Sequence, residues 1–203
     1  MPKEKTTETQ ILEAAKSVFM IKGKAGARMQ EIADKAGINK SLLHYYFRSK
    51  NKLFDAVFEY VFQKFAPNLF DIFKEDIPFT EKICKFSDGY IDVISRNPFI
   101  PVFVINELNN KKSDKLIAGI KSLGVKTDIV EQQILEQIKQ GNIRKIDPVH
   151  FMIDIIALNV FPFAAQPIIN KMFFEDDNKG HQQFMRERKE HVKSMILNYL
   201  RPQ

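Results

Sequence analysis

The sequence predicts an all-α fold of about nine helices. Apolar residues recur three and four positions apart, as at Ile11, Ala15, Val18 and Phe19, which places them on one face of a helix. No stretch near the N-terminus alternates between apolar and polar residues with the period of two that a half-buried strand needs. Glycines and prolines stand between the periodic segments and mark their ends. These observations favour consecutive helices over a sheet.

The N-terminal part is predicted to form a bundle of three helices. Thr6 or Thr7 can cap the first helix, because a threonine oxygen accepts a hydrogen bond from a free amide of the first turn. That helix is expected to end at Gly23 and Gly26, and the second helix is expected to stop at Gly37. The second and third helices are predicted at about 28–35 and 40–47.

A longer helix is predicted next, over about residues 51–66, with Pro67 marking its end. It carries two apolar stripes, so it should be buried on two sides. The stripes are Leu53, Val57, Tyr60 and Val61, and Phe54, Phe58, Phe62 and Phe65. We therefore expect an N-terminal domain over residues 1–52, this linking helix, and a C-terminal domain over residues 67–203.

The C-terminal domain is predicted to be helical throughout. Asp147 can cap one of its helices, with Pro148 at the first helical position and Pro162 expected to kink it. A polar loop is expected at residues 175–180. The predicted helices are 80–96, 99–109, 115–140, 148–165 and 181–200.

The last two predicted helices carry more apolar surface than one domain can cover. The apolar run at Val149–Ala165 has only 17 residues and includes His150 and Asp154, whereas a membrane span needs about 20 mostly apolar residues. We expect no membrane segment and interpret the run as a buried helix. A homodimer formed through the last two helices would cover the remaining apolar surface. The alternative is a deeper core within one chain.

The positive charge of the chain is concentrated near its N-terminus. Residues 1–52 carry 11 Lys and Arg against 5 Asp and Glu, whereas residues 53–203 carry 20 of each. This asymmetry favours a polyanionic partner for the N-terminal part, although an ordinary solvated surface would also account for it.

Cys84 is the only cysteine, so no disulfide can form within the chain, which fits a reducing cytoplasm.

The stretch from Met29 to Lys52 has the pattern of a helix-turn-helix. A small residue, Ala33, stands where the second helix would cross the first, and Gly37 can take the positive φ of the turn. The predicted third helix carries basic, hydroxyl and aromatic side chains outside its packing face, and a helix of this kind fits the major groove of DNA. Ser49 can cap the helix that follows. The alternative is an ordinary helical hairpin in an all-α domain.

The segment IADKAGINKSLLHYYFRSKNKL, Ile32 to Leu53, resembles the signature of the TetR family of bacterial transcriptional repressors. The later segment GNIRKIDP, Gly141 to Pro148, is also similar to that family. The resemblance implies a scaffold, a set of side chains facing bases, and a set holding phosphates. The scaffold would be Ile32, Ala33, Gly37, Leu43 and Phe47. The base-facing residues would be Asn39, Lys40, Ser41, Leu42 and Tyr45, and the phosphate-binding residues His44, Tyr46 and Lys50.

Several residues depart from the family pattern. A threonine pair usually precedes the second helix, but Ala27 and Arg28 stand there, which removes a capping hydroxyl. Arg28 can bind a phosphate instead. Ser41 replaces a usual glycine, and His44 begins the sequence His-Tyr-Tyr in place of Tyr-Tyr-His. These changes affect the expected operator sequence and not the expected fold.

The resemblance also implies an effector site among the helices of the C-terminal domain. Our candidates are aromatic side chains with one polar group, as small-molecule sites often have. For each of them, a place in the plain hydrophobic core is the favoured interpretation. They are Phe86, Tyr90, Phe103, Asn159 and Phe163. We find no metal-ligand spacing, no cofactor motif and no recognisable catalytic set in the sequence, and we expect no enzyme activity.

The sequence thus favours a cytoplasmic repressor that binds a palindromic operator in double-stranded DNA as a dimer and is released by a small apolar effector. The first alternative is a helical small-molecule-binding protein or enzyme that does not bind DNA. A second is a dimeric adaptor for a protein partner. Retention on heparin or random duplex DNA at low salt would distinguish the DNA-binding repressor from both alternatives.

Overall fold

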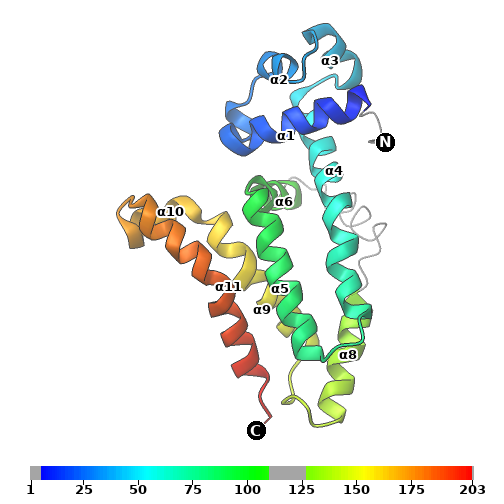
Figure 1. The fold of residues 1–203 in the computed structure, drawn as a ribbon, viewed down its shortest axis with the longest axis vertical. Helices are drawn as coiled ribbons and strands as arrows, with labels where there is room; N and C mark the ends of the chain where they lie inside the picture. The colour runs from blue at the N-terminus through cyan, green and yellow to red at the C-terminus, as the bar shows by residue number, and fades with distance from the viewer. Residues whose placement is uncertain (1–5, 110–126, 203) are drawn as a thin grey trace. The chain divides into compact units, whose positions relative to one another are not determined.

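The computed structural model describes residues 6–109 and 127–202, with the side chains of 65, 66, 103 and 106–109 left aside. These ranges contain ten α-helices and one short 3-10 helix, and they contain no strand (Figure 1). The predicted all-α class is therefore confirmed. The chain divides into two compact units, Met1–Phe65 and Ala66–Gln203, and helix α4 continues from the first unit into the second.

The first unit contains α1 (Thr7–Gly26), α2 (Met29–Lys35), α3 (Lys40–Tyr46) and the start of α4 (Lys50–Asp71). The oxygen of Thr6 caps α1 by accepting a hydrogen bond of 3.3 Å from the amide of Thr9. Each helix then buries one apolar stripe in a shared core. The fully buried side chains are Ile11, Ala15, Phe19, Ile32, Ala33, Leu43, Leu53 and Val57.

Pro67 does not end the linking helix, so that prediction was wrong. Helix α4 runs through Pro67 to Asp71 and continues as the 3-10 helix η1 (Ile72–Lys74). A proline inside a helix costs about 3 kcal/mol, so the helix persists only where other contacts hold it. Beyond the proline, Leu69 is buried and the ring of Phe70 lies 5.6 Å from that of Phe86. These contacts hold the last turn of α4 within the second unit.

The second unit is built around α5 (Phe79–Arg96), which packs against α9 and α11 and also contacts α6 and α8. Two ion pairs join α5 to α11, at 2.7 Å between Asp92 and Lys189 and at 3.2 Å between Asp88 and Lys193. The first part of the predicted helix 115–140 lies outside the described residues. The other helices are α6 (Phe99–Asn109), α8 (Thr127–Lys139), α9 (Pro148–Ala164), α10 (Gln166–Phe174) and α11 (Asn178–Leu200).

The sequence analysis missed helix α10. The chain bends by 73° between α9 and α10, at Ala165, and then resumes a helix with Pro167 in its first turn. The predicted polar loop is also shorter than expected, because Asp177 caps α11 through its bonds to the amides of Lys179 and Gly180. Asp147 caps α9 as predicted, accepting from the amide of His150 at 2.9 Å.

No single helix in the described part of the chain is long and apolar enough to cross a membrane.

We predict that Gly37→Ala destabilises the first unit, because Gly37 has a φ of 69° that side chains of L-residues rarely adopt. Nothing lies within 4 Å of an added Cβ, so the cost is conformational and about 1–2 kcal/mol. Thermal unfolding followed by circular dichroism should show the loss. Gly26→Ala is the matched control: its Cβ would make an ordinary 3.4 Å contact, and this change should be neutral or slightly stabilising. Equal effects of the two changes would contradict this account.

Candidate DNA-binding surface and regulatory unit

Helices α2 and α3 form the predicted helix-turn-helix. The backbone amide of Ile38 donates to the carbonyl of Ala33 at 3.0 Å, and Gly37 between them has the left-handed conformation that the turn requires. Leu43 is the buried residue of α3, and Phe47 at its C-terminal end is also buried. The small side chain of Ala33 is fully buried, as expected for the position where the two helices approach. One side of α3 is thereby fixed against the rest of the unit.

The opposite side of α3 is exposed to solvent. Tyr45 is the most exposed of its large side chains, at 81% of its surface, and its ring makes an edge-to-face contact of 5.6 Å with the ring of Tyr46. The structure brings six of the predicted DNA-binding residues together here, namely Lys40, Ser41, Leu42, His44, Tyr45 and Tyr46. This side of α3 combines positive charge, hydroxyl groups and aromatic rings, which suits both base edges and phosphates.

Asn39 has a structural task that the sequence analysis did not assign to it. Its side-chain oxygen caps α3 by accepting from the amide of Leu42 at 2.7 Å. The side-chain amide nitrogen of Asn39 is not used by this cap. At the start of α4, the hydroxyl of Ser49 accepts from the amide of Lys52 at 3.2 Å, so the predicted cap of that helix is confirmed.

The two remaining predicted DNA-binding residues are Arg28, which precedes α2, and Lys50, which is the first residue of α4. Arg28 is exposed, and as the residue before α2 it makes no capping bond with its side chain, as expected from the missing hydroxyl. Lys50 is half-buried, and its ammonium donates bonds of 3.1 Å to the carbonyls of Ala25 and Ala27. These carbonyls lie at the end of α1, beyond the break in its helical backbone at Gly23. Lys50 therefore connects the start of α4 to the end of α1.

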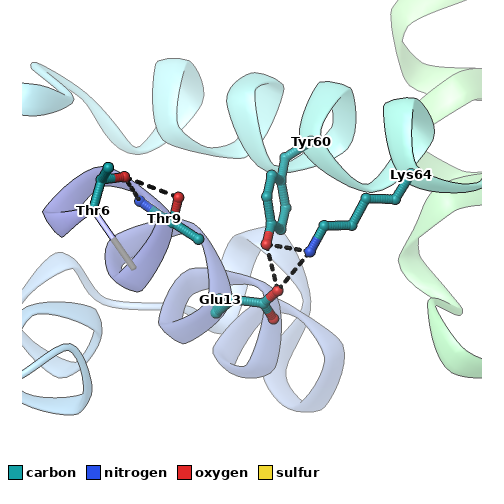
Figure 2. Close-up of polar contacts among 5 residues, drawn as sticks. All are labelled: Thr6, Thr9, Glu13, Tyr60 and Lys64. Carbon is teal, nitrogen blue, oxygen red and sulfur yellow. Dashed lines mark hydrogen bonds and ion pairs between the residues drawn. The ribbon is translucent and has the colours of Figure 1, made fainter. Parts of the chain in front are cut away.

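A cluster of three polar side chains forms a second connection between α1 and α4 (Figure 2). The carboxylate of Glu13 accepts from the hydroxyl of Tyr60 at 2.5 Å and from the ammonium of Lys64 at 3.0 Å, and that ammonium also bonds to the Tyr60 hydroxyl. The hydrogen bond from Tyr60 is the main cause that lowers the pKa of Glu13. Burial, followed by the bond to Glu13, raises the pKa of Tyr60. The sequence analysis placed Tyr60 on an apolar stripe and missed this cluster.

Comparison with known proteins identifies the N-terminal unit. The family model for bacterial regulatory proteins of the tetR family matches residues 11–57, which cover α1 to α3 and the start of α4. The chain belongs to the TetR family of transcriptional regulators. Its N-terminal unit is accordingly a DNA-binding unit, and the chain is a transcriptional regulator. The relatives of the chain are also transcriptional regulators and not enzymes.

Members of the TetR family resemble the chain over different lengths. The transcriptional regulator RutR of Escherichia coli O157:H7 is 29% identical over 198 residues, which cover 95% of this chain and 89% of RutR. The transcriptional repressor NicS of Pseudomonas putida is 30% identical over 135 residues, which cover 62% of each chain, less than two thirds of NicS. A TetR/AcrR family regulator from Thermobifida fusca has the same fold, with a TM-score of 0.68, 17% identity, and coverage of 93% of this chain and 97% of that one.

The second unit of this TetR-family chain brings Tyr90, Asn159 and Phe163 together where α5 meets α9, whereas the neighbouring Phe86 of α5 packs against Phe70 and Phe73. The rings of Phe86 and Tyr90 lie 5.8 Å apart on α5, and Tyr90 packs with Phe163 of α9 in one apolar cluster. Asn159 is fully buried and accepts a hydrogen bond of 2.8 Å from Ser87 of α5. Phe103 belongs to α6, but its side chain lies outside the described residues. Ser87 was not predicted, because a lone serine carries no signal in the sequence.

Two of the gathered side chains have polar groups with unusual surroundings. Burial raises the pKa of Tyr90 to about 12, because the charged phenolate would lose its hydration there. The side-chain nitrogen of Asn159 is buried and has no hydrogen-bond partner among the described residues. Buried polar groups are nearly always paired, so an unpaired amide is a place where a ligand or a water can bind.

A groove of about 460 Å³ lies elsewhere in the second unit, between α9 and α11. Its walls are mainly apolar, and the side chains of Phe161, Met195 and Tyr199 on it are exposed. It also contains two charged residues, Asp154 on α9 and Arg188 on α11. The sequence analysis assigned these helices to a dimer interface and did not single out the two charges.

We predict that Glu13→Gln destabilises the first unit by about 1 kcal/mol at neutral pH, because it weakens one charged hydrogen bond and one partly exposed ion pair. The pKa of Glu13 is lower in the folded chain than in the unfolded chain, so its carboxylate stabilises the fold above its ordinary pKa of about 4.3. That contribution disappears as the pH falls through the folded value. Urea unfolding at pH 7 and at pH 3 should therefore show a difference between wild type and variant that shrinks at pH 3.

Glu59→Gln provides the control for this prediction, because Glu59 is exposed on α4 of the same unit. It should leave the free energy of unfolding nearly unchanged at both pH values. An equal loss of stability in both variants, or a Glu13→Gln effect that does not depend on pH, would contradict the role given to Glu13.

Proposed function

We propose that the chain is a ligand-responsive repressor that binds a palindromic operator as a homodimer. The observation that carries the proposal is the exposed side of α3, which presents basic, hydroxyl and aromatic groups on a firmly packed helix. The net charge of +6 over residues 1–52 supports it, because phosphate contacts supply most of the affinity for DNA. The relative NicS, which matches 62% of this chain, is named a repressor, whereas FasR of Mycolicibacterium smegmatis, which matches 25% of it, is named an activator, and the longer match favours repression. Such a regulator works in the cytoplasm, where the bacterial chromosome lies.

The proposal divides the surface into two groups of side chains. Tyr45 is the main member of the first group, which reads base edges in the major groove, because it is the most exposed of the large side chains on α3. The second group holds phosphates and positions the helix without reading the sequence. The first group is Asn39, Lys40, Ser41, Leu42 and Tyr45, and the second is Arg28, His44, Tyr46 and Lys50.

We place the dimer interface on α9 and α11. Several large apolar side chains on these helices are exposed in the single chain, and extensive exposed apolar surface usually marks a protein interface. A dimer would in turn require a palindromic operator, since a two-fold axis relates two recognition helices that must lie about 34–36 Å apart to enter successive major grooves. The exposed side chains are Val149, Ile153, Ile156, Phe161, Met195, Leu197 and Tyr199.

We place the effector between α5 and α9, beside Tyr90 and Asn159. Aromatic rings supply an apolar wall there, and the unpaired amide of Asn159 supplies a donor that orients the ligand. An effector that binds more tightly to a dimer with a different spacing of its recognition helices lowers the affinity for DNA by that difference in binding free energy. The effector is therefore a small, mainly apolar molecule with one hydrogen-bond acceptor.

The test is selection of bound duplexes from a random DNA pool. We expect the selected sequences to contain two half-sites related by two-fold symmetry, with centres about 10 base pairs apart or a multiple of this. Tyr45→Ala should change the preferred bases within each half-site and keep the spacing, whereas Tyr45→Phe separates the contribution of the hydroxyl from that of the ring. Selection of no sequence above background, or of single unpaired sites, would contradict the proposed function.

A second prediction concerns Lys50, whose ammonium has one hydrogen left after its two bonds to α1. If that hydrogen binds a phosphate, Lys50→Met should weaken binding to all duplexes alike and reduce the slope of log affinity against log salt by about one. Fluorescence anisotropy at several salt concentrations measures both quantities. Lys139→Met removes the same charge from the second unit and should leave the slope unchanged. An unchanged slope in Lys50→Met, together with a lower melting temperature, would reduce the role of Lys50 to positioning α1.

A further inference from the structure

The groove between α9 and α11 contains one acid and one base that do not pair with each other. Asp154 and Arg188 both line it, yet no ion pair joins them or connects either of them to another described residue. The other lining residues are apolar, so the two charges stand out chemically. In this apolar groove, the carboxylate and the guanidinium each lack an ion-pair partner of opposite charge in the described part of the chain.

Arg188 is held partly out of solvent. It is half-buried, and one of its terminal nitrogens donates a bond of 2.9 Å to the carbonyl of Leu158. Its Nε is buried and has no partner among the described residues. Burial lowers the pKa of the guanidinium, because the cation loses part of its hydration there. A guanidinium has five N–H donors in a planar fork, so Arg188 can still bind a carboxylate through its free side.

Asp154 is in the opposite situation. It is exposed on α9, one helical turn before Leu158 and two turns before Phe161, so the three side chains project on neighbouring parts of one face. That face belongs to the surface where we place the dimer interface. In a dimer, Asp154 would lose water and need a cation, just as Arg188 needs an anion.

Two-fold symmetry can satisfy both needs at once. In such an interface, if residue i of one protomer contacts residue j of its partner, then j of the first also contacts i of the second. A surface that carries one acid and one base in the same groove is therefore complementary to a second copy of itself. We propose that Asp154 of each protomer pairs with Arg188 of the other, so that two symmetric ion pairs set the register of the α9–α11 interface. This inference rests on the proposed dimer and adds the residues that determine its specificity.

Charge reversal with mixing tests the proposal. Arg188→Glu puts two carboxylates opposite each other in a homodimer, and Asp154→Lys puts two cations there. Each variant alone should dimerise more than about tenfold more weakly than wild type, because like charges in an interface repel. A mixture of the two variants should recover dimers, because each contact in the heterodimer again joins an acid to a base. Sedimentation velocity over a range of concentrations measures the dimer fraction.

The ion pair between Asp92 and Lys189 gives a matched control, because it joins α5 to α11 within one protomer at 2.7 Å. Asp92→Lys and Lys189→Glu should leave the dimer constant near that of wild type, alone and when mixed. For the Asp154 and Arg188 variants, recovery in the mixture supports the proposal, because a pair within one protomer cannot be restored by mixing. Single variants that dimerise like wild type, or variants that stay monomeric when mixed, would overturn it.

Neutral variants keep the test decisive if a reversed charge prevents folding. Arg188→Gln and Asp154→Asn each remove one member of the pair, and the double variant should dimerise no more weakly than the weaker single variant, since the pair is already lost. Fully additive effects on the dimer constant would overturn the proposal. A wild-type chain that is monomeric at all concentrations would instead contradict the proposed homodimer itself, so the two failures can be told apart.

Discussion

The DNA-binding surface depends on the packing of one short helix. Helix α3 has only seven residues, and a helix of that length is not stable alone in water. It is held by the buried side chain of Leu43, by Phe47 at its end, and by the cap from Asn39. Because these three contacts use one side and both ends of the helix, the remaining side chains are free to face DNA. The contacts of Glu13 and Lys50 extend the same constraint to α1 and α4. Any movement of α4 within this unit therefore acts on the end of α1.

The second unit faces a different physical problem. Helix α9 is apolar almost all round, so α5 can cover only part of its surface. On the covered side, the buried bond between Ser87 and Asn159 fixes how the two helices meet, because an apolar contact alone would tolerate sliding. On the other side, α9 and α11 form a groove with exposed apolar residues, Asp154 from α9 and Arg188 from α11. In the proposed homodimer, a second chain covers both with one symmetric interface.

Features that depend on local sequence were predicted well. The three helices of the first unit, the turn at Gly37 and the caps at Ser49 and Asp147 follow from residues a few positions apart. Predictions failed where distant contacts decide the outcome. Helix α4 continues through Pro67 because Phe70 packs on Phe86, and α10 forms after a bend that no local residue announces. Asn39 caps α3 and was predicted as a base-facing residue, and the sequence pattern could not distinguish these two roles.

The sequence by itself determined the all-helical class, the helix-turn-helix and the family, because helical periodicity and turn residues act over one or two turns of chain. It also determined that the positive charge lies near the N-terminus. Only the tertiary structure decided which side chains meet across the sequence: Glu13 with Tyr60, Lys50 with the end of α1, and Ser87 with Asn159. It also decided that Asp154 and Arg188 share one groove without pairing. Such encounters depend on how helices pack, and helix packing is set by the whole core and not by any short segment.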